Sequence, residues 1–331
     1  MTDSIRLHGF AAVVVLASTV LVPASLQAAN VACGDILSGT SVVLDGNVGP
    51  CATSHAISVI NGAKLDLNGF TVSCDGSTGS VGVTVAQGST LRNGIVTGCE
   101  FTGVQVSGSK GSLLEHVIAR DNPGAGISVF STDASTLRNN AAAGNGTDGF
   151  FVATAGSKLV SNVAWDNGTN GFLITAAVSS SGNRSTGNFN GFRIDGNGGK
   201  FKNDVAIANG SLGFIVNGDG NSLKKVIGDS TGYGVYLSGN ENDVVKAVLS
   251  GNSNGVYITG DGNLVSGSRV LGGGGAQNYG LRLGPFADNN VIKKNHFWGH
   301  GTADLASDVV TCGSNVFSGN AAATRTDACM Q

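Results

Sequence analysis

A four-residue unit recurs ten times in this chain and strongly limits the folds open to it. Each copy reads glycine, apolar, variable, apolar, and successive copies begin 20 to 25 residues apart, 22 on average. The leading glycines are Gly82, Gly103, Gly126, Gly149, Gly171, Gly191, Gly213, Gly234, Gly255 and Gly280. Repeats of this length form solenoids, because one unit cannot bury its apolar side without a neighbour.

The units are predicted to be short strands rather than helices. Apolar residues alternate over two to four positions and are bounded by Gly and Asn turns, such as Asn167-Gly168. No segment after the N-terminal apolar run keeps a 3.6-residue apolar period over three turns, and the 53 glycines would break helices. Coils with three short strands would pair in parallel at about 4.8 Å per coil and wind right-handed. We therefore predict an all-β, right-handed parallel β-helix of about 11–12 coils with roughly 22 residues per coil.

The stacked coils suggest roles for the recurrent glycines and asparagines. The glycine that heads each unit suits a backbone corner with a positive φ angle. The recurrent asparagines would hydrogen-bond with their copies in the coils above and below, which satisfies buried polar groups of the turns.

The ends of the chain differ from the repeat. Arg6 precedes an apolar run from Phe10 to Val22, followed by small residues up to Ala29, a pattern typical of a secretory signal peptide. The run is shorter than the ~20 residues needed to cross a bilayer. We assign 1–29 to a signal peptide, 30–55 to an N-terminal cap, 56–320 to the β-helix and 321–331 to a C-terminal cap or tail, and we expect secretion or a periplasmic location.

Cysteine content and charge limit the partners. All six cysteines follow the predicted signal peptide, an even number that fits disulfides in an oxidising compartment. The chain has no C-x-x-C motif, which argues against zinc. A net charge of −3 offers no basic excess for nucleic acid. We expect a monomer with no stable membrane span.

The repeat resembles that of the bacterial right-handed parallel β-helix family, within the pectate-lyase-like superfamily. The resemblance covers Lys64 to about Asn320, and the stretch Lys64 to Val72 looks like the first complete coil of the family. The resemblance is specific for the fold but not for the function, because lyases, hydrolases, epimerases and adhesins all have this fold.

An alignment of two early coils predicts a disulfide. Leu67 to Cys74 matches Leu91 to Cys99 with one residue inserted early in the second copy. Cys74 and Cys99 would then lie in adjacent coils with Cα atoms about 5 Å apart, inside the disulfide range. Cys33 with Cys51, and Cys312 with Cys329, would close the two ends.

The variable position of each unit points outward and forms one column along the stack. The column reads Thr84, Gln105, Ser128, Phe151, Leu173, Arg193, Ile215, Tyr236, Tyr257 and Arg282. The column two residues further on contains Asp195. We call these two columns the outer ribbon. Aromatic side chains beside hydrogen-bonding groups suit sugar rings, and the carbohydrate-binding candidates are Phe151, Arg193, Asp195, Tyr236, Tyr257 and Arg282. These aromatics also fit ordinary outward strand positions.

Arg193 and Asp195 are the candidate catalytic pair, in which Arg193 would hold a uronate carboxylate and Asp195 would act as base, acid or Ca²⁺ ligand. They could equally form a surface ion pair. Asp219 and Asp261 share one turn position two coils apart and are the candidate Ca²⁺ ligands, although Asp is also a normal turn residue. Lysines such as Lys202 and Lys224 should stack as a basic stripe, which would attract an anionic polymer or keep a solvated face soluble. No other cofactor is indicated.

Motifs of the enzymatic branches of the family are missing. The Arg-x-Pro-x-x-Arg pattern of pectate lyases and the Asp-Pro-His motif of alginate epimerases do not occur. The Gly-His-Gly tripeptide around His300 matches one polygalacturonase motif, but the aspartates of that branch are absent. We therefore predict an exported protein that binds a polysaccharide along the outer ribbon, with β-elimination on a uronate polymer as the reaction if it is an enzyme. The alternative is a non-catalytic surface scaffold or adhesin-like protein.

Overall fold

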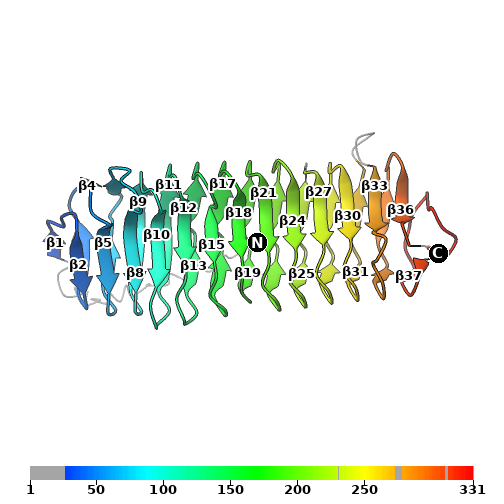
Figure 1. The fold of residues 1–331 in the computed structure, drawn as a ribbon, viewed down its shortest axis with the longest axis horizontal. Helices are drawn as coiled ribbons and strands as arrows, with labels where there is room; N and C mark the ends of the chain where they lie inside the picture. Colours follow the sequence, from blue (N-terminus) through cyan, green and yellow to red (C-terminus); the bar gives the residue numbers. More distant parts are fainter. Residues whose placement is uncertain (1–26, 230, 273–277, 310–311, 331) are drawn as a thin grey trace, which may run out of the picture.

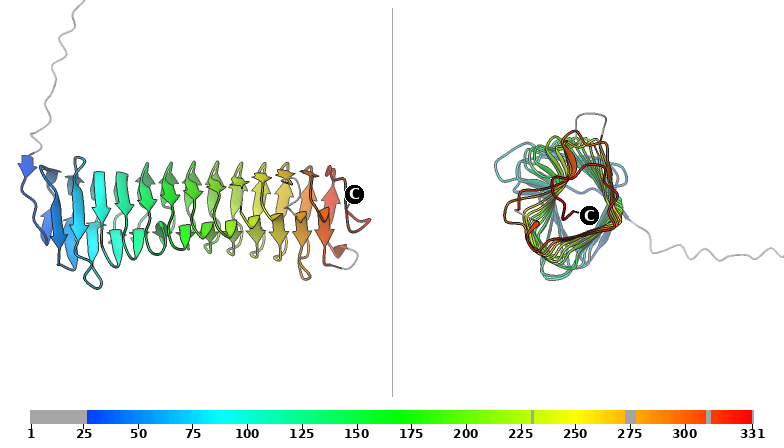
Figure 2. Two further views of the ribbon diagram at one scale, coloured as in Figure 1. Left: turned by 90° about the horizontal axis from the view of Figure 1, so that it is seen from above. Right: turned by 90° about the vertical axis from the view of Figure 1, so that its right-hand side faces the viewer.

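The computed structural model describes residues 27–229, 231–272, 278–309 and 312–330, which form a rod of stacked coils (Figure 1). Every regular element named in this part of the chain is a β-strand, and strands of successive coils pair in parallel. Seen down the long axis, the coils superimpose (Figure 2). The predicted all-β parallel solenoid is confirmed.

Thirteen strands form one continuous sheet whose order follows the chain. They are β2 (Asp35–Ser38), β5 (His55–Ile60), β8 (Val81–Ala86), β10 (Thr102–Ser107), β12 (Ala125–Val129), β15 (Phe150–Val152), β18 (Asn170–Ile174), β21 (Asn190–Ile194), β24 (Leu212–Val216), β27 (Tyr233–Leu237), β30 (Asn254–Ile258), β33 (Tyr279–Leu283) and β36 (Ala303–Ser307). The repeated tetrads lie in this sheet, which carries the outer ribbon.

The other two sides of the rod form a 24-stranded sheet. One side stacks β1 (Gln27–Ala29), β3 (Ser41–Leu44), β6 (Lys64–Asp66), β13 (Thr136–Arg138), β16 (Lys158–Val160), β19 (Ser179–Ser181), β22 (Lys200–Lys202), β25 (Ser222–Lys224), β28 (Asp243–Val245), β31 (Leu264–Ser266), β34 (Val291–Lys293) and β37 (Val316–Ser318). The second side stacks β4 (Val48–Cys51), β7 (Thr71–Cys74), β14 (Ala141–Ala143), β17 (Val163–Trp165), β20 (Arg184–Thr186), β23 (Val205–Ile207), β26 (Ile227–Asp229), β29 (Val248–Ser250), β32 (Arg269–Leu271) and β35 (His296–Trp298). The eight-residue strands β9 (Thr90–Thr97) and β11 (Leu113–Arg120) run through both sides and join them.

The stack begins earlier than the tetrads indicate. β2, β3 and β4 pair with β5, β6 and β7, so the segment assigned to an N-terminal cap already forms a coil. This coil lacks the glycine-led tetrad, and it contributes to the total of thirteen against the expected 11–12.

Inward side chains repeat in register and form the core. Phe150, Phe172, Phe192 and Phe214 are fully buried in four adjacent coils. Their ring centroids are 4.6 to 4.9 Å apart and their planes lie within 8° of parallel. Each aromatic pair contributes roughly 0.5–1.5 kcal/mol beyond the apolar area it buries.

Buried asparagines form the predicted ladders at the turns. Asn145 Oδ1 accepts hydrogen bonds from the backbone N–H and the Nδ2 of Asn122, at 3.2 and 2.9 Å. Asn167, Asn188 and Asn209 continue the pattern in the next three coils. A second ladder runs from Asn140 through Asn162 and Asn183 and ends on the buried Asp204. Turn groups inside the rod are therefore satisfied by the same residue one coil away.

The prediction that the tetrad glycines occupy backbone corners with a positive φ angle is wrong. None of the ten has a positive φ angle. A Cβ on Gly126 would instead lie 2.7 Å from the carbonyl oxygen of Gly149 and from Nδ2 of Asn145. A Cβ on Gly191 would likewise lie 2.3 Å from the carbonyl oxygen of Gly213. Glycine is required because the neighbouring coil and the asparagine ladder leave no space for a side chain.

The three disulfides pair as predicted, with Cα atoms 5.4 Å apart for Cys33–Cys51, 4.9 Å for Cys74–Cys99 and 6.4 Å for Cys312–Cys329. The alignment behind Cys74–Cys99 is nevertheless out of register. Leu91 pairs with Leu65 rather than with Leu67, which is a shift of two residues. Thr71 pairs with Ile95 and Ser73 with Thr97, so near the cysteines the shift is one residue and the additional residue of the second copy is Gly98. Gly98 has a φ of +73° and returns Cys99 to the side of Cys74.

The C-terminal coil is closed by a buried histidine–aspartate contact. His300 Nδ1 lies 2.6 Å from Asp304 Oδ1, and both side chains are almost completely buried. Asp304 Oδ2 accepts the backbone N–H groups of Ala323 and Thr324, at 2.7 and 3.1 Å. Asp304, which contacts His300 through its other oxygen, therefore anchors the terminal segment.

The signal peptide assigned to 1–29 lies outside the described residues except for β1, which pairs with β3. In the part of the chain that the structure describes, no helix reaches the length and hydropathy needed for a bilayer span.

Candidate functional site

The outer ribbon is in register over the length of the rod. Arg193 pairs with Leu173 on one side and Ile215 on the other, and Ile215 pairs with Tyr236. Tyr236, Tyr257 and Arg282 follow one another in the last coils. The six carbohydrate-binding candidates therefore lie on one face, as the period of the repeat predicts.

All four tyrosines of the chain meet on this face. The Tyr236 and Tyr257 rings stack with centroids 5.5 Å apart and planes 13° apart. Tyr233 lies 6.2 and 5.8 Å from these two rings. The Arg282 guanidinium covers Tyr257 at 5.8 Å and Tyr279 at 5.1 Å. We call these four residues the tyrosine cluster.

The two arginines of the ribbon are each held by a carboxylate. Arg282 forms a two-oxygen ion pair with Asp308, and this contact raises the pKa of Arg282. Arg193 Nε donates to both oxygens of Asp195 at 3.1 and 2.9 Å. Partial burial raises the pKa of Tyr257, so its hydroxyl stays protonated at neutral pH.

Asp195 also belongs to a chain of polar contacts along the ribbon. It accepts a 2.6 Å hydrogen bond from Asn217 Nδ2, and Asn217 Oδ1 accepts one of 2.6 Å from Ser238. These contacts fix the orientation of Asp195 and leave Arg193 about half exposed.

A third outward column was missed in the sequence. It consists of the residue directly before each tetrad glycine and contains Asp148, Tyr233 and Tyr279. Tyr233 pairs with Leu212 and Asn254, and Asn254 pairs with Tyr279. The same 22-residue period would have revealed this column, because Tyr233 and Tyr279 each precede a tetrad glycine.

Near the N-terminal end of the ribbon the surface is hollowed. A groove of about 460 Å³ lies over β12 and is lined by Glu100, Phe101, Gly124, Ala125, Ser128, Phe130, Thr147, Asp148, Phe151 and Leu173. Three lining residues of the β12 coil, Gly124, Ala125 and Ser128, are small. In the neighbouring coils Thr102 pairs with Ala125, and Gln105 and Phe151 pair with Ser128, so the side chains on either side are larger. Phe151, one of the predicted carbohydrate-binding residues, packs against Phe130 with ring centroids 5.0 Å apart in this groove.

The candidate Ca²⁺ ligands cap the turns instead of converging. Asp219 Oδ1 accepts the backbone N–H of Asn240, and Asp261 Oδ1 accepts that of Asp288. Within the described residues no group of three or more His, Cys, Asp or Glu side chains is placed to hold a metal ion. The geometry of these turns accounts for both aspartates without a cation.

Comparisons with known proteins agree on the architecture. The family model described as "Right handed beta helix region" matches residues 54–206 and 212–330. The A-module of the mannuronan C-5 epimerase AlgE6 of Azotobacter vinelandii is similar in structure, with a TM-score of 0.60 and 17% identity over 86% of this chain and 91% of that module. The Dettilon tailspike protein is similar with a TM-score of 0.53 and 14% identity over 86% of this chain and 62% of that protein. A comparison with curated protein sequences finds no match. At these identities the likeness concerns the fold.

Proposed function

The chain belongs to the right-handed β-helix family, and we propose that it is an exported protein that binds a polysaccharide along the outer ribbon. The tyrosine cluster carries this proposal. Four half-buried tyrosines, one arginine and a neighbouring carboxylate form a surface with both flat apolar faces and hydrogen-bonding edges. Sugar rings have matching apolar faces and hydroxyl edges.

The repeat supports a polymeric ligand. Outward residues recur once per coil, at a spacing of about 4.8 Å, so contacts are available at regular intervals along the rod. A groove at one end and an aromatic cluster at the other give an extended chain two anchoring regions. The similarity in fold to a module named as a mannuronan epimerase points to the same broad class of substrate.

Export rests on two observations. The N-terminal 29 residues have the pattern of a signal peptide, and the three disulfides fit an oxidising compartment. We propose secretion or release into the periplasm.

The second candidate is β-elimination on a uronate polymer, for which the two ribbon arginines are the supporting observation. Arg193 or Arg282 would exchange its aspartate partner for the substrate carboxylate. A base would take the proton α to that carboxylate, a C=C bond would form between the α and β carbons, and the β C–O bond would break, with the leaving oxygen taking up a proton.

Assays of the purified protein with a series of uronate polymers distinguish a polysaccharide-binding protein from a uronate lyase. Turnover appears as ultraviolet absorbance of the unsaturated product, and Arg193→Ala should then reduce kcat by about 100-fold or more, the range for loss of a charge-stabilising group. Arg184→Ala, an exposed arginine on β20, is the matched control. Binding without turnover supports the binding protein alone. Failure to bind any glycan would contradict the proposed function and favour a surface scaffold.

A further inference from the structure

The groove over β12 differs in charge from the rest of the outer ribbon. Two carboxylates, Glu100 and Asp148, line it, and no lysine, arginine or histidine does. The arginines of the ribbon are already paired with Asp195 and Asp308. Among the described residues neither Glu100 nor Asp148 forms an ion pair with a basic side chain.

Each of these carboxylates is fixed through one oxygen. Glu100 Oε2 accepts the backbone N–H of Gly79 at 2.6 Å. Asp148 Oδ1 accepts the backbone N–H and Nδ2 of Asn170, at 3.1 and 2.8 Å, and the hydroxyl of Thr169. The second oxygen of each has no donor within the described part of the protein and remains available to a ligand.

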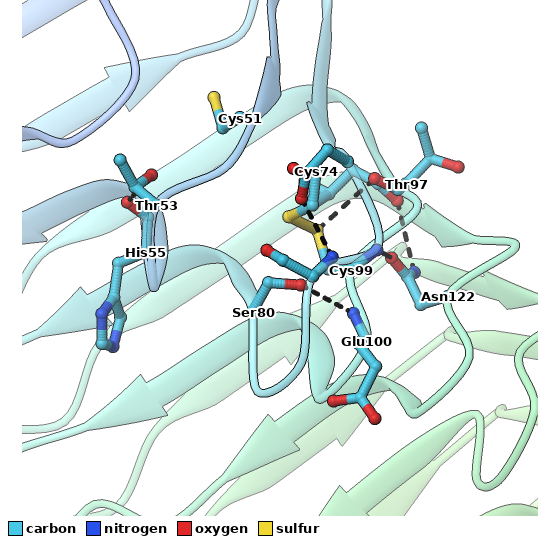
Figure 3. The surroundings of a disulfide bond; sticks show 12 residues. Cys51, Thr53, His55, Cys74, Ser80, Thr97, Cys99, Glu100 and Asn122 are labelled. Carbon is cyan, nitrogen blue, oxygen red and sulfur yellow. Dashed lines mark hydrogen bonds between the residues drawn. A yellow bond between two sulfur atoms is a disulfide. The ribbon is translucent and has the colours of Figure 1, made fainter.

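The wall that carries Glu100 is held rigidly. Glu100 directly follows Cys99, which is bonded to Cys74, and its backbone N–H donates to Ser80 Oγ at 2.9 Å. Figure 3 shows the Glu100 side chain extending away from the disulfide that anchors its backbone. A carboxylate fixed in this way loses little freedom when a ligand binds.

Aromatic faces complete the groove. Phe101 and Phe130 are 50% and 42% exposed, which is unusual for such large apolar side chains. Rings that lie beside carboxylates in an otherwise apolar groove attract an ammonium group through both its charge and its interaction with the π-faces.

We propose that this groove binds a sugar residue with a free ammonium group, so that the polysaccharide contains non-acetylated amino sugars. This inference rests on the proposed function, because it names the substrate class for one part of the same ribbon. A uronate in the groove would place its carboxylate beside two like charges that have no compensating cation.

The test compares one oligosaccharide with and without its amine charge. Glucosamine oligomers and the same oligomers after N-acetylation are titrated into the purified protein at pH 6 by calorimetry. The free-amine form should bind about tenfold tighter or more, and raising the salt concentration should weaken only that form. Asp148→Asn and Glu100→Gln should each remove most of the preference. Asp133→Asn, which changes an exposed carboxylate in the turn between β12 and β13, should keep it.

A second variant tests the groove itself. Ala125→Leu, which fills the space over β12, should abolish the preference for the amine while binding at the tyrosine cluster remains. Equal affinity for both oligomers, or tighter binding of a uronate oligomer that Ala125→Leu removes, would overturn the inference. If either of these results is found and glycan binding still depends on the tyrosines, the proposed function stands without the amino-sugar inference. If the natural protein binds no glycan at all, both the proposed function and the amino-sugar inference are contradicted.

Discussion

Tyr236 and Tyr257 occupy the same position in adjacent coils, and their rings stack with centroids 5.5 Å apart. The double variant Tyr236→Ala, Tyr257→Ala should weaken polysaccharide binding by about 10- to 100-fold, since each aromatic contact contributes roughly 0.5–1.5 kcal/mol. Calorimetric titration measures the change. Trp298→Ala, which removes an exposed aromatic from β35, is the control and should leave affinity unchanged. Equal losses in both variants would indicate that the tyrosine cluster is not the binding surface.

Asp204 ends an asparagine ladder and should limit stability at neutral pH. It is fully buried, and burial raises its pKa to about 6. Because the folded state binds this proton more tightly than the unfolded state, whose pKa is about 3.9, stability falls as pH rises from about 4 to about 6. Asp204→Asn removes this loss and should stabilise the protein by about 2 to 3 kcal/mol above pH 6, and by nothing below pH 4.

Urea unfolding at pH 4, 6 and 8 checks this difference. Asp219→Asn, in an exposed turn, retains a side-chain oxygen for the N–H of Asn240 and should change stability by less than about 0.5 kcal/mol. An Asp204→Asn variant that is no more stable than the natural protein at pH 8 would refute the assignment.

The steric role of the tetrad glycines predicts an unequal cost for two alanine substitutions. Gly191→Ala should destabilise by about 3 kcal/mol or more, because its Cβ would lie 2.3 Å from the carbonyl oxygen of Gly213. Gly220→Ala, at a turn with a φ of +64° and open space, should cost about 1 kcal/mol. Thermal unfolding midpoints rank the two variants. The reverse order would contradict the steric explanation of the tetrad glycines.

The Cys74–Cys99 disulfide should support both stability and the groove. Replacing both cysteines with alanine should cost about 2–4 kcal/mol of unfolding free energy, typical for a loop of this length. Because Glu100 directly follows Cys99, binding in the groove should also weaken, whereas binding at the tyrosine cluster should not. Unchanged affinity in the groove would show that Ser80 and Gly79 position Glu100 without the disulfide.

The period of the repeat made most of the fold predictable. Ten glycine-led units fix which residues share a face, so the positions of Arg193, Tyr236 and Tyr257 followed without a structure. The disulfide Cys74–Cys99 was predicted despite an alignment that is out of register by one to two residues, because neighbouring coils bring the same part of each turn together.

Features without a periodic signal were missed. The first coil lacks a tetrad, so β2 to β4 could not be recognised as part of the stack. The groove over β12 arises from three small residues beside larger neighbours, and such a difference in side-chain volume is visible only once the coils are aligned. The ion pair of Arg282 with Asp308 was also missed, because Asp308 lies 26 residues further along the chain and outside the tetrads, whereas an ion pair between Arg193 and Asp195 was one of the two interpretations that the sequence offered.

A crystal structure of the protein with its tightest-binding oligosaccharide tests most directly whether the outer ribbon is the ligand-binding surface. We predict sugar rings against Tyr236 and Tyr257, with the chain running parallel to the rod axis towards Phe151. An oligosaccharide bound on the lysine-bearing sides of the rod, or across its ends, would contradict this account.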